Sequence, residues 1–232
     1  MLAADGVRVN PWLRRLSLLW LGLKRPFLLP RVRRHTLESV DGVPILVWPD
    51  VLNPVVFRSG KYLAKIISNL EPTYGRALDM GTGSGVGAIF AARRGFRVTA
   101  VDLNPEAVRC ARINILLNRL EGQVEVREGD LFEPVAGERF DLVTFNPPFF
   151  RGDPQSLFDM AWRSRDVLER FAAGLAGALT EDGQALILLS TDGDGDVLLR
   201  VLRTSGFQVE VAGRRNFGNE IMTVYSARME KG

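Results

Sequence analysis

Short apolar segments alternate with amphipathic segments along the chain from about residue 76, and this alternation predicts its secondary structure. Seven strands are predicted, at residues 77–80, 97–102, 123–127, 140–145, 184–190, 207–213 and 220–228. Helices are predicted between them at 86–95, 105–118, 162–179 and 196–205. Before residue 76 the pattern predicts a strand or two around 44–48 and a helix near 59–70.

This order of elements predicts an α/β fold. Strands that alternate with helices form a parallel sheet with helices on both faces. Only residues 214–219 separate the last two strands, which is too short for a crossover helix, so these strands should form an antiparallel hairpin. We expect a Rossmann-like, doubly wound, seven-stranded sheet that is mostly parallel and ends in a C-terminal antiparallel hairpin. We divide the chain into an N-terminal extension packed on the core (1–54) and one domain (55–232).

Composition excludes several classes of protein. The 232 residues are 46% hydrophobic and 25% charged, which is ordinary for a globular domain and excludes a disordered chain. One cysteine, Cys110, and one histidine, His35, exclude an internal disulfide and a zinc site with several thiolates, and we expect no metal. The acidic segment 192–196 lacks the downstream glutamate of a calcium loop and indicates a turn that leads into a helix.

Charge is concentrated at the N-terminus. Residues 1–37 hold eight basic residues and one acid, whereas the rest of the chain carries a net charge of −4. The apolar segment 17–23 is too short to span a bilayer and has no signal-peptide cleavage site, so we expect a cytoplasmic protein without an integral membrane segment. The pattern favours a helix docked on the domain, with contact to substrate or nucleic acid and association with a membrane surface as alternatives. One helical face carries Trp12, Leu16, Leu19, Trp20 and Leu23.

Candidate ligand-binding residues follow four of the predicted strands, and ligands bind at this edge of open parallel sheets. The strand 77–80 is followed by a glycine-rich loop, Gly81–Gly85, whose backbone can approach a ligand closely. Asp102 ends the next strand and is placed to accept hydrogen bonds from a ribose diol, and Asp130 from an exocyclic amine. The loop and Asp102 alone fit dinucleotide enzymes equally well. Together with the segment 146–149, they predict an adenosine-bearing ligand.

These segments resemble the motifs of class I S-adenosylmethionine (SAM)-dependent methyltransferases. Residues 78–85, 101–104 and 129–132 resemble the three nucleoside-binding motifs of that class. Asn146-Pro147-Pro148-Phe149 resembles the (Asn/Asp/Ser)-Pro-Pro-(Tyr/Phe) signature of the branch that methylates planar nitrogens. This branch includes adenine-N6 and guanine-N2 enzymes of nucleic acids and glutamine-N5 enzymes that modify peptide release factors. The resemblance, to methyltransferase small-domain and release-factor glutamine methyltransferase-like proteins, covers about residues 55–230.

The resemblance implies a role for each matching residue. The amino-acid end of SAM would lie against Gly81, Thr82, Gly83 and Gly85, with Asp79 near its ammonium group. Asp102 and Leu103 would bind the ribose, and Asp130 and Leu131 the adenine. The Asn146 side-chain oxygen, also close to the cofactor, and the Pro147 carbonyl would accept hydrogen bonds from the target NH2 group. Pro148 would fix the turn, and Phe149 would stack on the planar substrate.

The chemistry supports these roles. An amide or aromatic amine has a delocalised lone pair and is a poor nucleophile, so two acceptors on its N–H groups make the nitrogen more electron-rich and orient it. Such a reaction needs no strong base, in agreement with the single histidine. On the substrate side we expect lining residues Phe57, Arg58, Ser59, Phe150 and Arg151.

We therefore expect a SAM-dependent N-methyltransferase whose acceptor is RNA or a protein glutamine, with a small molecule as an alternative. Release-factor enzymes usually have tyrosine in place of Phe149 and a long helical N-terminal domain, while the basic N-terminal segment slightly favours RNA. An NAD-type Rossmann oxidoreductase would explain the glycine loop and Asp102 but not residues 146–149. A non-catalytic nucleoside-binding module would require a degraded pocket. Calorimetry with SAM and with NAD distinguishes the methyltransferase from the oxidoreductase.

Overall fold

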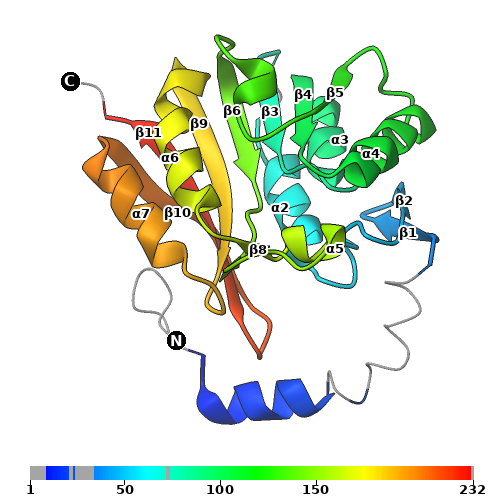
Figure 1. Ribbon diagram of the computed structural model, residues 1–232, viewed down its shortest axis with the longest axis vertical. Helices are drawn as coiled ribbons and strands as arrows, with labels where there is room; N and C mark the ends of the chain where they lie inside the picture. The colour runs from blue at the N-terminus through cyan, green and yellow to red at the C-terminus, as the bar shows by residue number, and fades with distance from the viewer. Residues whose placement is uncertain (1–8, 21–22, 24–33, 72–73, 231–232) are drawn as a thin grey trace.

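The structure is a computed structural model that describes residues 9–20, 23, 34–71 and 74–230, and its centre is a seven-stranded sheet (Figure 1). The strand order is β10-β11-β9-β6-β3-β4-β5. Strand β11 is antiparallel to both of its neighbours, and all other pairs are parallel. This confirms the expected fold, including the C-terminal hairpin. The strands are β3 (Arg76–Met80), β4 (Arg97–Asp102), β5 (Val124–Glu128), β6 (Phe140–Phe145), β9 (Leu179–Ser190), β10 (Phe207–Asn216) and β11 (Ile221–Met229).

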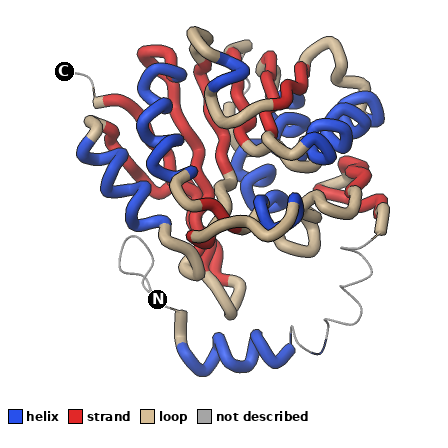
Figure 2. Tube along the Cα trace, viewed as in Figure 1, coloured by secondary structure: helices blue, strands red, loops and turns tan. Residues whose placement is uncertain are grey.

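Helices cover both faces of this sheet (Figure 2). Helices α2 (Ser59–Ser68), α3 (Val86–Arg93) and α4 (Pro105–Leu117) share one buried apolar cluster with the sheet. Helices α6 (Val167–Ala178) and α7 (Gly195–Thr204) share a second cluster, on the opposite face. Since successive side chains of a strand point to opposite faces, neighbours such as Ala77 and Leu78 on β3 belong to different clusters. A short 3-10 helix, η1 (Glu133–Val135), follows β5.

The start of the helix predicted at residues 162–179 differs from the prediction. The helix predicted from residue 162 begins only at Val167, and the chain before it forms β7 (Phe150–Arg151), α5 (Leu157–Met160) and β8 (Arg163–Ser164). Strands β7 and β8 pair in parallel as a small separate sheet. The prediction was wrong because the apolar residues of this segment cover a cavity and do not continue the face of α6. Strand β9 likewise begins five residues before the predicted position, at Leu179, opposite Phe140.

Part of the N-terminal extension is a β-hairpin on helix α4. Strands β1 (Thr36–Val40) and β2 (Val43–Val47) pair antiparallel. The Asn114 side chain of α4 is fully buried, accepts a 2.7 Å hydrogen bond from the Leu46 N–H and donates a 2.7 Å bond to the Leu46 carbonyl. This exchange connects the hairpin to the core. The domain boundary at residue 54 stays a prediction.

A second part of the extension is a helix over residues 11–20, drawn in blue at the bottom of Figure 1. It contacts the body through Arg14, which forms a 3.0 Å ion pair with Asp192. The basic residues Arg8, Lys24, Arg25, Arg31 and Arg33 lie outside the described residues. In the part of the chain that the structure describes, no helix is long and apolar enough to cross a bilayer.

Candidate active site

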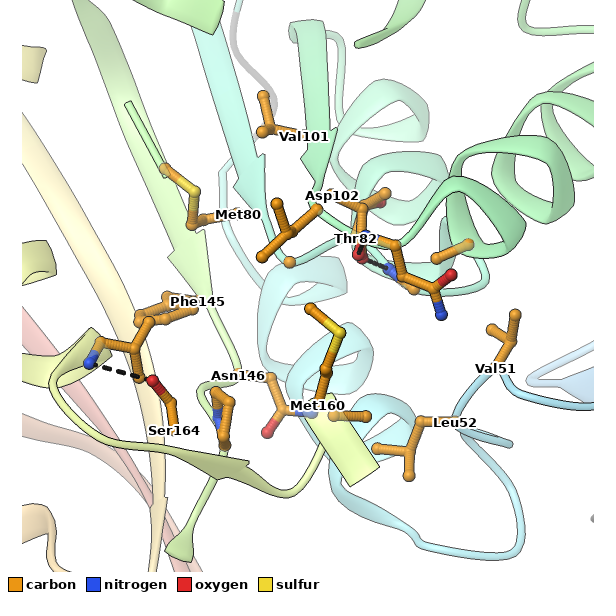
Figure 3. A pocket seen from close by; sticks show the side chains of 18 of the residues that line it. Val51, Leu52, Met80, Thr82, Val101, Asp102, Phe145, Asn146, Met160 and Ser164 are labelled. Carbon is orange, nitrogen blue, oxygen red and sulfur yellow. Dashed lines mark hydrogen bonds between the residues drawn. The ribbon is translucent and has the colours of Figure 1, made fainter. Parts of the chain in front are cut away.

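A cavity of about 250 Å³ lies where the carboxyl ends of β3, β4 and β6 meet (Figure 3). In the view of Figure 3, Asp102 and Thr82 lie at one end and Asn146 lies at the other. The structure therefore brings together side chains that follow three different strands, as the strand-end motifs predict. The lining includes nine of the predicted site residues, Gly81, Thr82, Gly83, Asp102, Leu103, Asp130, Leu131, Asn146 and Pro148.

The glycine-rich loop follows β3 and begins helix α3. Gly81, Gly83 and Gly85 have φ values of 62°, 55° and 80°, in the left-handed region that side chains with a Cβ rarely adopt. The Gly83 N–H donates a 2.8 Å hydrogen bond to Oδ2 of Asp102. The loop is thereby tied to the end of β4, with Gly81 and Gly83 on the cavity wall. Gly85 caps α3 and does not line the cavity.

Asp79 lies beneath this loop and is not part of the cavity lining. Its carboxylate accepts hydrogen bonds from the hydroxyls of Thr82 and Thr144, both at 2.6 Å, and from the Ala88 N–H at 2.9 Å. Burial raises the pKa of Asp79, while these three donors act in the opposite direction. Asp79 therefore joins β3, β6 and α3 beneath the loop. Its contact with a ligand ammonium group stays a prediction.

Asp102 ends β4 and faces the cavity. Oδ1 accepts a 2.9 Å hydrogen bond from the Asn104 N–H, and Oδ2 accepts the Gly83 bond. Removal from water raises the pKa of Asp102 to about 6, the charge of Asp79 acts in the same direction, and the two N–H donors oppose the shift. A carboxylate oxygen has more than one acceptor position, so Asp102 can still accept hydroxyl donors from a ligand.

Asp130 lies in the turn between β5 and η1 and lines the same cavity. Arg170 of α6 lines the cavity opposite it. Nη2 of Arg170 donates to Oδ2 of Asp130 at 2.5 Å. Sequence reasoning missed Arg170, because nothing in the pattern of a helix shows which of its basic residues reaches a site. Apolar side chains also line the cavity and suit a flat aromatic ring: Met80, Val101, Leu131 and Phe145.

Asn146 follows β6, and the two polar atoms of its side chain differ in their hydrogen bonding. Its Nδ2 donates a 3.1 Å hydrogen bond to the Ser59 hydroxyl. Its Oδ1 is buried and has no hydrogen-bond partner among the described residues. Of the two prolines that follow, Pro148 lines the cavity and Pro147 does not. The Asn146 amide therefore presents an unsatisfied acceptor at the wall of the cavity.

The remaining predicted site residues do not line this cavity: Phe57, Arg58, Ser59, Pro147, Phe149, Phe150 and Arg151. Arg58, with a φ of 65°, donates to Oδ1 of Asn219 at 2.9 Å and pairs with Glu220 at 3.0 Å. Arg151 forms ion pairs with Glu169 and Asp194. The side chains of both arginines are thus engaged with protein groups. Substrate contact by this set of residues stays a prediction.

The segment 150–164 covers one side of the cavity. Met160, Arg163 and Ser164 line it, although the sequence pattern assigned most of them to a helix or gave them no role. Trp162 packs edge-on against Phe57, with ring centroids 4.7 Å apart and planes at 81°. This contact joins the covering segment to the loop that precedes α2.

Comparison with known proteins agrees with this structure. The strand order, with a cavity at the carboxyl edge of the parallel strands, is that of class I SAM-dependent methyltransferases. The sequence profile of the methyltransferase small domain family matches residues 59–212, and the chain belongs to this family.

Three relatives illustrate the range of similarity. One from Methanocaldococcus jannaschii, whose assigned name is protein N5-glutamine methyltransferase, is 30% identical over 199 residues, or 82% of this chain and 97% of the relative. Ribosomal RNA small subunit methyltransferase C from Escherichia coli is 37% identical over 122 residues, or 51% of this chain and 34% of that enzyme. The solved Pyrococcus abyssi tRNA (uracil-54, C5)-methyltransferase, in complex with S-adenosyl-L-homocysteine, is 20% identical, with a TM-score of 0.58 over 84% of this chain and 44% of that one.

The chain is therefore a SAM-dependent methyltransferase, and SAM is its cofactor. The alternative of an NAD-type oxidoreductase finds no support in these similarities. The match to the ribosomal RNA enzyme spans about a third of that enzyme, so its substrate does not transfer with the similarity.

Proposed function

We propose that this enzyme transfers the methyl group of SAM to a planar nitrogen, the side-chain amide of a protein glutamine. The observation that supports this most directly is the buried Oδ1 of Asn146, which has no partner among the described residues and lies at the cavity. A buried acceptor without a partner costs about 1–3 kcal/mol, which a bound ligand recovers by donating an N–H. Primary amides and exocyclic amines supply such a donor.

The cavity fits the cofactor. Asp102 would accept hydrogen bonds from the ribose hydroxyls, because its carboxylate faces the cavity and is fixed by two backbone donors. The backbone of Gly81 and Gly83 would lie against the amino-acid end, and Leu131 and Met80 against the adenine. When bound, SAM supplies a methyl group on a positively charged sulfur, which makes that carbon electrophilic.

The protein's part of the reaction is to position and polarise the nitrogen. Oδ1 of Asn146 and the carbonyl of Pro147 would accept the two N–H bonds of the target NH2 group, which turns its lone pair toward the methyl carbon. The N–H groups become more acidic as the nitrogen gains the methyl group, so these hydrogen bonds strengthen in the transition state. The N–C bond would form as the carbon–sulfur bond breaks with its electron pair left on sulfur, which becomes a neutral thioether. The nitrogen would lose one proton to solvent, and the product would be the N-methyl amide.

Similarity over 82% of this chain favours a protein glutamine as the acceptor, since the relative with that name is matched over 97% of its length. An RNA base amine is the second candidate. It is supported by the similarity to the ribosomal RNA enzyme and by the eight basic residues among residues 1–37.

The test is incubation with SAM that carries a radiolabelled methyl group and an extract of the source cells, followed by separation of protein, RNA and small molecules. We expect label in protein, recovered after digestion as N-methylglutamine. Asn146→Ala should lower methylation by about 10²–10³-fold, a much larger effect than its effect on SAM affinity, as for the loss of a transition-state acceptor. Label only on oxygen or carbon, or full activity of Asn146→Ala, would overturn the proposal. Label only in RNA would assign the second candidate.

A further inference from the structure

The helix over residues 11–20 turns its apolar side away from the protein. Its polar side faces the body: Arg14 pairs with Asp192, and a Cβ atom on Gly218 would lie 2.2 Å from Oγ of Ser17. The opposite side is an apolar stripe, which we define as Trp12, Leu13, Leu16, Leu19 and Trp20 of the helix together with Leu23, the next described residue. Each of these side chains is at least 51% exposed.

This orientation is the reverse of the usual one. A surface helix normally packs its apolar stripe on the core and turns its polar face to water. Residues 12, 16 and 19 recur at helical spacing, so they form one continuous strip. A contiguous exposed apolar strip on a soluble domain marks a surface that another structure covers. The contacts of the helix with the body are made by Arg14 and Ser17, on its polar side.

Charge indicates what covers the stripe. Residues 6–37 contain no aspartate or glutamate. The Arg15 guanidinium lies 5.7 Å from the ring centre of Trp12, so a cation borders the stripe. In the sequence Arg8 precedes the helix, and Lys24 and Arg25 follow it. An apolar strip with tryptophan and leucine, bordered by cations and free of acids, matches the layered chemistry of an anionic bilayer surface, with acyl chains beneath negative headgroups.

We propose that the apolar stripe docks this enzyme on anionic lipid bilayers, with the helix lying in the plane of the interface. RNA offers phosphates to the arginines but has little apolar surface to bury the four leucines of the stripe. The proposal does not depend on the identity of the methyl acceptor, because it rests on the exposure and charge of the helix alone.

The contact between the helix and the body determines which edge of the sheet would face the lipid surface. Asp192, the partner of Arg14, precedes Gly193 in the turn after β9. That turn packs on the signature segment: a Cβ atom on Gly193 would lie 2.6 Å from the Phe149 carbonyl oxygen, and the Asp194 N–H donates to this oxygen at 3.3 Å. The helix is thus fixed to the same edge of the sheet as residues 146–149. Docking would bring this edge toward the lipid surface.

The experiment is sedimentation of the full chain with vesicles of phosphatidylcholine alone and with vesicles that contain phosphatidylglycerol. We expect binding to the anionic vesicles at least tenfold stronger than to neutral ones, and weaker binding as salt rises. The variant L16E/L19E should lower this binding at least tenfold and keep the melting temperature and SAM affinity of the parent. The control is L37E, which places one such charge on a leucine of β1 that is 68% exposed, and it should bind like the parent.

Two results would overturn the proposal: no binding of the parent to anionic vesicles, or equal loss of binding in L37E and L16E/L19E. Binding of a structured RNA that is stronger than vesicle binding and is lost in L16E/L19E would also overturn it, in favour of nucleic acid. Failure of glutamine methylation would leave the vesicle result unchanged, so the two proposals fail separately.

Discussion

Nδ2 of Asn146 donates a hydrogen bond to Oγ of Ser59 at 3.1 Å, across 87 positions of sequence. Ser59 is 2% exposed and is the first residue of α2. The residue before it, Arg58, has a left-handed backbone conformation, and its guanidinium donates hydrogen bonds to Asn219 and Glu220. Ser59 thus takes one of the two N–H donors of this amide, while Oδ1 of Asn146 has no partner among the described residues.

Ser59→Ala should lower kcat by about tenfold or less, since one hydrogen bond contributes about 0.5–1.5 kcal/mol. SAM affinity should not change, because Ser59 does not line the cavity. Ser59→Thr keeps a hydroxyl and should recover most of the rate. Parallel calorimetry and initial-rate measurements check this. Equal losses in the alanine and threonine variants would mean that Ser59 matters for packing and not for orienting Asn146.

Asp102 should make cofactor binding depend on pH. Its carboxylate form would accept the ribose hydroxyls, and burial raises its pKa to about 6. Lowering the pH from 7 to 5 should therefore weaken SAM binding by about tenfold, as one pH unit below the pKa leaves about a tenth of the group ionised. Asp102→Asn should bind SAM weakly at pH 7 and show little change between pH 5 and 7. Calorimetry across this range measures both.

The same group should have the opposite effect on the stability of the cofactor-free protein. The folded-state pKa lies above the unfolded value of 3.8, so the folded state binds this proton more tightly. The stabilising contribution is complete below pH 3.8 and is lost as pH rises through about 6. Between pH 5 and pH 7 the free energy of unfolding of the parent should therefore fall relative to that of Asp102→Asn. A difference that is constant in denaturant titrations would contradict this pKa.

Gly87→Ala should destabilise the protein by about 1–3 kcal/mol, as overpacked sites do. Its Cβ would lie 2.4 Å from Oδ1 of Asp79, a carboxylate fixed by three hydrogen bonds. Gly177→Ala in α6 is the matched control, because its Cβ meets nothing within 4 Å. That change should stabilise by about 0.5–1 kcal/mol, through the helix propensity of alanine. Chemical denaturation of both variants measures whether each change raises or lowers the free energy of unfolding.

Trp162→Ala should weaken SAM binding by about two- to tenfold. The edge-on contact with Phe57 is worth about 0.5–1.5 kcal/mol and joins the covering segment to the loop before α2. Residues on both sides of Trp162 line the cavity. Trp162→Phe retains an aromatic ring and should keep most of the affinity. Unchanged binding by the alanine variant would show that this contact does not support the cavity.

The fold was predictable where burial is simple. Strands β3, β4 and β6 are covered on both faces, so they appear in the sequence as short apolar runs, and their predicted bounds fall within one residue of the structure. The segment 150–164 was not predictable in this way. Its apolar residues, Met160 and Trp162 among them, face a cavity and a neighbouring loop, and such contacts follow no regular period.

The site was predictable where it is local. The glycine loop and Asp102 each stand at a strand end, and parallel topology alone brings them to one edge. Arg170 and the Ser59–Asn146 bond depend on how distant elements pack, which sequence spacing does not encode. Asp79 stands near a strand end as predicted. Its hydrogen bond from Thr144, 65 positions away, likewise depends on packing and could not be predicted from sequence spacing.

The paired hydrogen bonds between Asn114 and Leu46 decide how the N-terminal segment can be removed. Deleting residues 1–54 would strip both bonds from a fully buried amide and uncover the apolar side of α4, so that shortened protein should fold poorly. Deleting only the residues before His35 leaves β1 and β2 in place. We therefore expect the basic, apolar terminus to be separable from the enzyme, whereas removal of the hairpin beside it should disrupt the folded domain.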